Sequence, residues 1–154
     1  MDESLEYRQK RIEEYKKAVL PLLFYLSWLE KNAGNEACSV YGGQGLDEHS
    51  MSFPVYDGTL MTFVREASES ALMYKDYLYL YTRRNIKSHE DERRLIVAAD
   101  LQDWDLLRGI LSRYILGGRT KGTLWSEAVR ERIFYLVLKR MKEIIEFWDK
   151  PLGL

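Results

Sequence analysis

The sequence is poor in cysteine: Cys38 is the only one among 154 residues. A single thiol excludes an intramolecular disulfide and a zinc site built on several cysteines. It is typical of proteins from a reducing compartment, so we expect a cytoplasmic protein in which Cys38 is buried as a small apolar side chain.

Long apolar segments are also missing. The longest, residues 18–26, contains Pro21 and is far shorter than the roughly 20 residues needed to span a bilayer. The N-terminus, MDESLEYRQKRIEEYKK, is too charged for a secretory signal peptide. The sequence therefore predicts no contact with a membrane.

An excess of one charge is absent as well, and the net charge of −1 does not favour a nucleic-acid-binding or membrane-surface protein. The charges are unevenly placed, however. Residues 1–76 hold 8 basic and 13 acidic residues, residues 77–154 hold 15 and 11, and residues 106–142 hold 9 and 2. The basic 106–142 region is the one electrostatic indication of an anionic ligand, and attraction between the two halves of the fold is the alternative explanation.

What the sequence does contain is apolar residues at helical spacing. Hydrophobic residues make up 46% of the chain and charged residues 31%, which is ordinary for a globular protein and too apolar for a disordered one. We predict a mainly α fold: a single helical domain over residues 1–154, built as a bundle of five to six helices with a small irregular or β-hairpin insertion near 37–56.

Residues 123–148 are predicted to form the central helix of this bundle. Apolar side chains recur there at three- and four-residue steps in two adjoining rows, and Thr123 is the expected N-cap. A stripe this wide needs packing partners on more than one side.

A second long helix is expected over residues 3–32, where apolar residues keep a heptad-like spacing. Pro21 predicts either a kink or a division into one helix that ends near Val19 and another that starts with Pro21. The uninterrupted spacing favours the kinked single helix, and Gly34 is its natural end.

Shorter elements fill the rest of the chain. Residues 37–41 and 51–56 have β-like composition and flank a Gly-rich loop, although Pro54 restricts the second segment to an edge. Helices are expected at 58–74 after Asp57, near 89–99 after a Ser88 capping box, and at about 101–116. The segment YLYLYTRR, residues 77–84, fits a strand or a helix equally, because it is apolar almost throughout.

Two stretches resemble a family. The segments SRYILGGRTKGTLWSEAVRERIFYLVLKRMKEI and FPVYDGTLMTFVREASES together cover about half the chain. They resemble a bacterial domain-of-unknown-function family of small helical proteins. Arg132 departs from its pattern, in which a small residue is expected. The resemblance implies a bacterial cytoplasmic helical protein and supplies no activity or catalytic residue.

The loop GGRTKGT, residues 117–123, is the sharpest candidate for a binding site. Backbone N–H groups and the positive dipole end of the following helix favour an anion there. Arg119, Lys121 and Thr123, with Arg113 nearby, form a hypothetical site for a phosphate or carboxylate. The spacing is not that of a Walker A loop. The simpler interpretation is an ordinary interhelical connection with solvated cations.

Aromatic and basic residues interleave at Tyr79, Tyr81, Arg83 and Arg84. Such a pattern suits stacking on single-stranded nucleic acid or contact with a protein partner. Packing of alternate tyrosines in the core is the simpler interpretation.

Carboxylates and imidazoles gather at residues 47–49 and again at 89–92. Such groups bind metals or transfer protons, but neither cluster has a metal-ligand spacing such as H-E-x-x-H. We therefore expect solvated loops and helix capping at both places, and we predict no metal site, cofactor or catalytic residue.

The sequence as a whole favours a non-catalytic protein-interaction or regulatory module, with an unknown protein partner or self-association as a homodimer. The alternative is a nucleic-acid or phosphate-ligand binder that uses the basic 106–142 region. An enzyme, with a site between the loop at 42–53 and the helices, is a third and less favoured interpretation.

Overall fold

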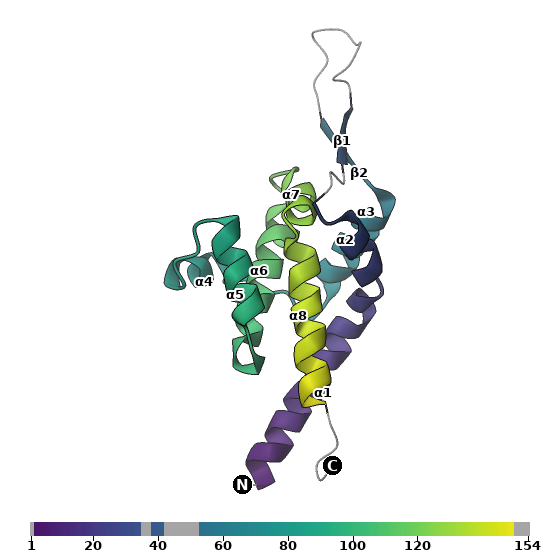
Figure 1. Ribbon diagram of the computed structural model, residues 1–154. Coiled ribbons are helices and arrows are strands. Elements are labelled where there is room, and N and C mark those ends of the chain that lie inside the picture. The colour runs from purple at the N-terminus through teal and green to yellow at the C-terminus, as the bar shows by residue number, and fades with distance from the viewer. Residues whose placement is uncertain (1, 35–37, 42–52, 150–154) are drawn as a thin grey trace.

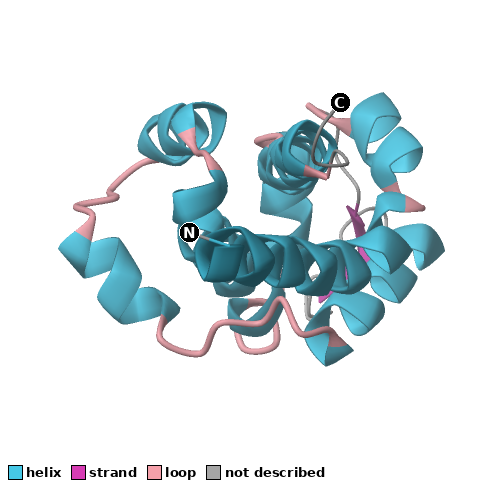
Figure 2. Cartoon of the chain, turned by 90° about the horizontal axis from the view of Figure 1, so that it is seen from below, coloured by secondary structure: helices cyan, strands magenta, loops and turns pink. Residues whose placement is uncertain are grey.

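The computed structural model describes residues 2–34, 38–41 and 53–149, and helices account for most of them (Figures 1 and 2). In chain order the elements are α1 (Asp2–Leu23), α2 (Leu26–Asn32), β1 (Cys38–Tyr41), β2 (Phe53–Tyr56), α3 (Gly58–Glu69), α4 (Tyr77–Arg83), α5 (His89–Ala98), the 3₁₀ helix η1 (Leu101–Asp103), α6 (Trp104–Gly117), α7 (Leu124–Arg130) and α8 (Ile133–Trp148). The mainly α prediction is confirmed. No helix among the described residues has the length and apolarity to cross a membrane.

Helix α8 occupies the centre of the molecule, as expected for the apolar stripe near the C-terminus. It packs against α1, α2, α5, α6 and α7, and α1 runs beside it in the opposite direction (Figure 1). Lys16 and Asp149 join these two helices through an ion pair of 2.7 Å.

The prediction of a single helix over residues 123–148 is wrong, because these residues form two helices, α7 and α8. Arg132 adopts the left-handed conformation with φ at 67°, which a continuous right-handed helix does not allow. Thr123, the expected N-cap, forms no side-chain capping bond. Glycine is the residue best suited to a left-handed position, so an arginine at position 132 does not by its residue type indicate a turn.

The predicted N-terminal helix is divided as well. Helix α1 continues through Pro21 and ends at Leu23, and α2 starts at Leu26. Both sequence alternatives are therefore wrong, since the break follows Pro21 and does not coincide with it. Gly34 has a φ of +87° just after α2, in agreement with its predicted role as a helix stop. These two divisions, together with the short α4, explain why the described residues hold eight α-helices where five or six were expected.

Strands β1 and β2 pair in antiparallel register and project from one end of the molecule (Figure 1). Cys38 lies opposite Tyr56, and Tyr41 lies opposite Phe53. Three predictions lie outside the described part of the chain. They concern the side chain of Cys38, the cluster at 47–49 and the loop at 42–53, of which only the backbone of Phe53 in β2 is described.

The caps predicted at Asp57 and Ser88 are confirmed, whereas the one predicted at Thr123 is not. The Asp57 carboxylate accepts bonds from Thr59 and Leu60, Ser88 accepts from the Asp91 N–H, and Asp100 forms a capping box with Asp103. Helix α3 ends at Glu69, five residues earlier than expected, and the ambiguous segment 77–84 is helical as α4.

An aromatic chain runs through the core towards the most polar part of the interior. Tyr25 packs on Phe63, Phe63 on Phe134 and Phe134 on Tyr114, with ring centroids 5.5, 5.1 and 6.3 Å apart. All four side chains are buried, and burial of each large side chain contributes about 2 kcal/mol or more. This series of packed rings fixes the position of Tyr114, whose hydroxyl donates a hydrogen bond to a buried carboxylate.

A candidate anion pocket beside a buried carboxylate

The first turn of α5 places His89 and Glu92 on one face of that helix. Ser88 caps the helix, and residues three apart lie above one another in a helical turn. The same face continues to Ile96, which is fully buried, so it is turned inwards. His89 and Glu92 therefore approach α6 and α7 rather than solvent.

Glu92 is a charged side chain in the interior, with an exposed fraction of only 2%. Its Oε2 accepts a hydrogen bond of 2.5 Å from the Tyr81 hydroxyl on α4, and its Oε1 accepts one of 2.7 Å from the Tyr114 hydroxyl on α6. His89 Nδ1 lies 2.9 Å from the same Oε1. Burial of a carboxylate costs several kcal/mol unless hydrogen bonds replace its water, and here three partners do so.

His89 bridges two carboxylates. Besides the contact of Nδ1 with Glu92, its Nε2 lies 2.8 Å from Oε1 of Glu127 on α7. These two contacts link α5 with α7 through the His89 ring.

Arg113 on α6 covers the other side of Glu92. Its guanidinium carbon lies 5.2 Å from the centre of the Tyr81 ring and 4.8 Å from that of Tyr114, so the flat group is held against two aromatic rings. Its Nη1 lies 3.6 Å from Glu92 Oε2, which is an ion pair beyond hydrogen-bond distance. Arg113 donates no hydrogen bond to the described residues, although a guanidinium carries five N–H donors.

A pocket of about 290 Å³ opens at this cluster. It is lined by Tyr81, Ile86, Lys87, Ser88, His89, Glu92, Arg113 and Glu127. At about 30 Å³ per water molecule, the space holds roughly ten waters or a ligand of similar size. Two cations and a histidine face two carboxylates, so the pocket offers both donors and acceptors to a small polar molecule.

The two tyrosines that bind Glu92 are held in their neutral form. Burial, followed by the nearby charge of Glu92 and its hydrogen bond, raises the pKa of both Tyr81 and Tyr114 far above the usual value of 10.0. Clusters of strongly shifted groups beside a pocket are common at functional sites. Within the described ranges, no three His, Cys, Asp or Glu side chains are arranged to hold a metal ion.

The structure brings together two residues that the sequence placed in different hypothetical sites. Tyr81 was predicted as a stacking residue and Arg113 as an anion-binding residue, and they are in contact at the pocket. Tyr79 points away and is 66% exposed. In a helix, residues two apart lie on opposite sides, whereas in a strand Tyr79 and Tyr81 would share a face.

The other predicted residues lie elsewhere. Arg83 is exposed on α4, and Arg84 pairs with Asp103 at 3.2 Å. Arg119 and Lys121 are exposed in the loop after α6 and do not line the pocket. The backbone N–H groups of residues 118–121 all donate to carbonyl groups of α6, so they form no free cradle for an anion. Whether Arg119, Lys121 and Thr123 bind an anion stays a prediction.

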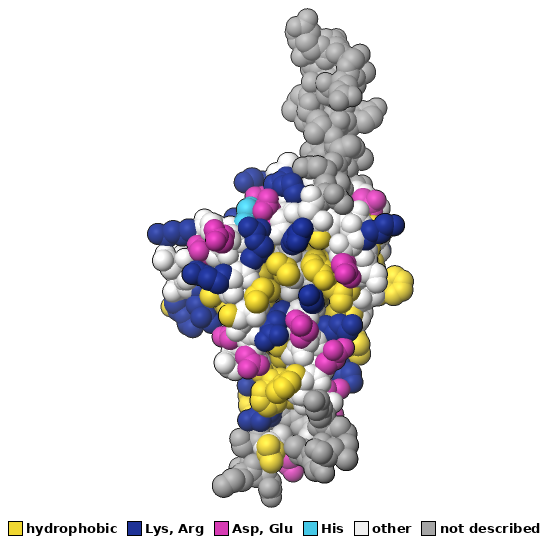
Figure 3. Space-filling model, in the orientation of Figure 1, with side chains coloured by type: hydrophobic (Ala, Val, Ile, Leu, Met, Phe, Trp, Pro, Cys, Tyr) yellow, Lys and Arg dark blue, Asp and Glu magenta, His cyan; other side chains and the backbone are white. Residues whose placement is uncertain are grey.

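The basic 106–142 region is neutralised in part by carboxylates of the C-terminal half. Arg113, Arg130 and Arg140 pair with glutamates of residues 92–143, and Lys142 pairs with Glu146. Arg108 donates to the carbonyls of residues 71–73, which anchors the chain after α3. Cations and carboxylates are interspersed on the face shown in Figure 3. Arg113 itself lies at its pocket beside Glu92.

Glu92 is the residue that the sequence interpretation missed. We expected residues 89–92 to be solvated, and this is wrong for Glu92, although the capping role of Ser88 and Asp91 is confirmed. A signal was present: His89, Glu92 and Ile96 follow the three- and four-residue spacing of an inward helix face. Charged residues are rare on the buried face of a helix, and for this reason the sequence favoured a solvated position for Glu92.

Comparisons with protein-family models, with curated proteins and with solved structures return no match to this chain. The resemblance to a bacterial family of small helical proteins stays a prediction.

Proposed function

We propose that this protein binds a small molecule carrying a carboxylate or a phosphate group, in the pocket between α4, α5, α6 and α7. One observation carries the proposal. The Arg113 guanidinium is held against two tyrosine rings beside the pocket and donates no hydrogen bond to the described residues. A preorganised guanidinium loses little entropy when it binds a planar or tetrahedral anion through two N–H groups.

The neighbouring side chains fit the same ligand. Lys87 lines the pocket and adds a second cation, and Glu127 accepts hydrogen bonds at its edge. The tyrosines, fixed by Glu92, keep Arg113 from rotating away. The proposal narrows the anion-binding alternative from the whole 106–142 region to one arginine in a pocket, and it places the ligand among small molecules rather than nucleic acids.

Thermal unfolding with increasing concentrations of inorganic phosphate, phenyl phosphate, acetate and benzoate at constant ionic strength tests the proposal. A ligand at 100 times its Kd stabilises the folded state by about 2.7 kcal/mol, which raises Tm by about 5 to 10 °C in a chain of this length. Arg113→Met keeps the apolar stacking area and removes the charge, so it should abolish the shift. The Tm shifts with the two phosphates and with the two carboxylates are compared, and the class of probe that gives the larger shift identifies the anion.

Arg119→Met is the matched control, since it removes an exposed cation from the predicted loop site. The ligand response should survive this change. If Arg119→Met abolishes the response and Arg113→Met does not, the anion binds at the loop and the pocket proposal is wrong. If no probe shifts Tm of the native protein, the proposal fails.

A protein-interaction module is the second candidate, and the exposed apolar surface of α4 favours it. Leu78 and Tyr79 are adjacent and expose 68% and 66% of their surface. Large exposed apolar and aromatic side chains are typical of contact surfaces. Light scattering of the native protein and of a Leu78→Ser, Tyr79→Ser variant tests self-association: a dimer that the double substitution converts to a monomer is expected, and a native monomer contradicts homodimerisation.

A further inference from the structure

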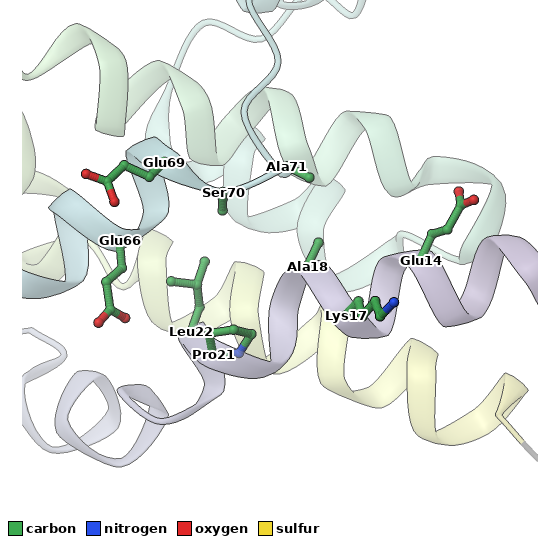
Figure 4. Close-up of a pocket in the computed structure, with 9 residues that line it drawn as sticks. All are labelled: Glu14, Lys17, Ala18, Pro21, Leu22, Glu66, Glu69, Ser70 and Ala71. Carbon is green, nitrogen blue, oxygen red and sulfur yellow. The ribbon is translucent and has the colours of Figure 1, made fainter.

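A larger cavity than the pocket at Arg113 lies between α1 and the end of α3 (Figure 4). It measures about 700 Å³, with Glu66 and Glu69 at one end, Lys17 beside Glu14 at the other, and apolar side chains between them. These groups do not select one kind of ligand. The pocket at Arg113 gathers charges of both signs in about 290 Å³, and its polar atoms define a ligand more closely.

The fixed charges that line the pocket balance one another. Besides His89, the lining includes two cations, Lys87 and Arg113, and two carboxylates, Glu92 and Glu127. A ligand with a single negative charge is attracted by the cations and repelled by the carboxylates of the same small space. A ligand with one charge of each sign avoids this conflict, provided that each of its charges finds a partner.

Glu92 has no capacity left for a ligand. Tyr114 donates to its Oε1, which also lies 2.9 Å from His89 Nδ1. Tyr81 donates to its Oε2, and Arg113 Nη1 lies 3.6 Å from the same oxygen. A carboxylate offers about two lone-pair sites on each oxygen, and both oxygens of Glu92 already have two partners. Glu92 therefore holds the walls of the pocket in place.

Glu127 on α7 is the carboxylate that a ligand reaches. Its side chain is 24% exposed, and His89 Nε2, 2.8 Å from Oε1, is its only hydrogen-bond partner within the described ranges. Lys87 forms no ion pair with Glu127 or with another carboxylate of that part of the chain. The pocket thus combines an acceptor oxygen, Oε2 of Glu127, with the unused N–H donors of Arg113.

We infer that the ligand of this pocket is a zwitterion, a small molecule that carries a primary ammonium group besides its carboxylate or phosphate. The inference rests on the anion pocket proposed above. The acid group binds Arg113, and the ammonium donates to Oε2 of Glu127. An ammonium has three donors, which suits a carboxylate with open lone pairs. Amino acids and aminoalkyl phosphates are the two sources of this chemistry.

Isothermal titration calorimetry at about pH 7.5 and constant ionic strength compares ligands that differ only in the amine, which is protonated at this pH. Glycine, β-alanine and 4-aminobutanoate are titrated beside acetate, propanoate and butanoate, and phosphoethanolamine is titrated beside ethyl phosphate. The chain lengths vary the separation of the two charges. We expect at least one amine-bearing ligand to bind about tenfold more tightly than its matched acid, because a hydrogen bond between charged groups contributes that much.

Glu127→Gln removes the charge, keeps an acceptor oxygen for His89 and should erase this preference while the acid still binds. Arg113→Met should abolish the binding of both members of a pair. Glu90→Gln is the matched control, because it removes an exposed carboxylate of α5 that does not line the pocket, and the preference should remain about tenfold. The preference is a ratio measured on one variant, so a change in stability alone does not produce it.

The inference is overturned, and the anion pocket stands, if the acids bind the native protein and no amine-bearing counterpart binds more tightly. It is also overturned if Glu127→Gln retains the preference, since the ammonium is then bound by another group. If neither the acids nor their amine-bearing counterparts bind the native protein, the proposed function fails together with this inference.

Discussion

Replacement of Glu92 by glutamine isolates the contribution of the buried carboxylate. The substitution keeps the size and shape of the side chain but puts an NH₂ group where one of the two oxygens was. One or two of the donors from Tyr81, Tyr114 and His89 then lose their acceptor. Hydrogen bonds to a charged partner contribute roughly 1.5 to 3 kcal/mol each, so we expect the free energy of unfolding to fall by about 3 kcal/mol.

For a chain of this length, that loss lowers Tm by about 6 to 12 °C. Calorimetry or circular dichroism measures Tm, and urea unfolding gives the free energy directly. Glu90→Gln is the matched control, because it removes the same charge from the same first turn of α5 at an exposed position. It should change stability by less than about 0.5 kcal/mol.

The outcome that refutes this account is a Glu92→Gln variant as stable as Glu90→Gln. The carboxylate would then contribute nothing beyond its interaction with the helix dipole, which both substitutions remove. A double-mutant cycle adds a second check: Tyr114→Phe should destabilise the native protein more than it destabilises the Glu92→Gln variant, since the bond between the two groups is already lost in the latter.

Burial raises the pKa of Tyr81 and Tyr114 above 10.0, so the stability that these two groups contribute is complete below pH 10.0 and is lost as the pH rises beyond it. Absorbance at 295 nm should show that both tyrosines ionise only when the protein unfolds. A single ionisation transition of all tyrosines in the native state would contradict this. Asp100 has a pKa below 3.8, chiefly through the Leu101 N–H, so its stabilisation is present above pH 3.8 and disappears at lower pH. Asp100→Asn should reduce the pH dependence of the urea unfolding midpoint between about pH 2 and 5. A pH dependence equal to that of the native protein would exclude this role for Asp100. Arg132→Gly should stabilise the left-handed turn by about 1 kcal/mol in urea unfolding, and destabilisation would show that its side chain matters more than its φ.

Much of the fold was predictable because its signals are local. The caps at Asp57 and Ser88 depend on hydrogen bonds within one turn, and the inward faces of α3, α6 and α8 follow from spacing alone. The divisions after Pro21 and at Arg132 were not predictable on this basis. Apolar spacing continues across both breaks, so the pattern does not distinguish a bent helix from two helices.

The site was less predictable than the fold. Tyr81 and Arg113 were singled out as candidates for separate reasons, but nothing in their spacing places them together. Their contact depends on how α4 packs against α6, which brings residues 32 positions apart to within 5.2 Å. Arg119 and Lys121 were equally plausible in the sequence, and the structure leaves them on the surface.

By itself, the sequence determined a mainly helical protein with one wide apolar stripe near its C-terminus, because periodicity and capping act within a few residues of each other. Only the tertiary structure decided that Glu92 is buried, that its carboxylate binds hydroxyl groups from α4 and α6, and that Arg113 stands beside a pocket. The reason is physical: burial of a charge depends on which helix faces meet and on the donors they bring, and these come from distant parts of the chain.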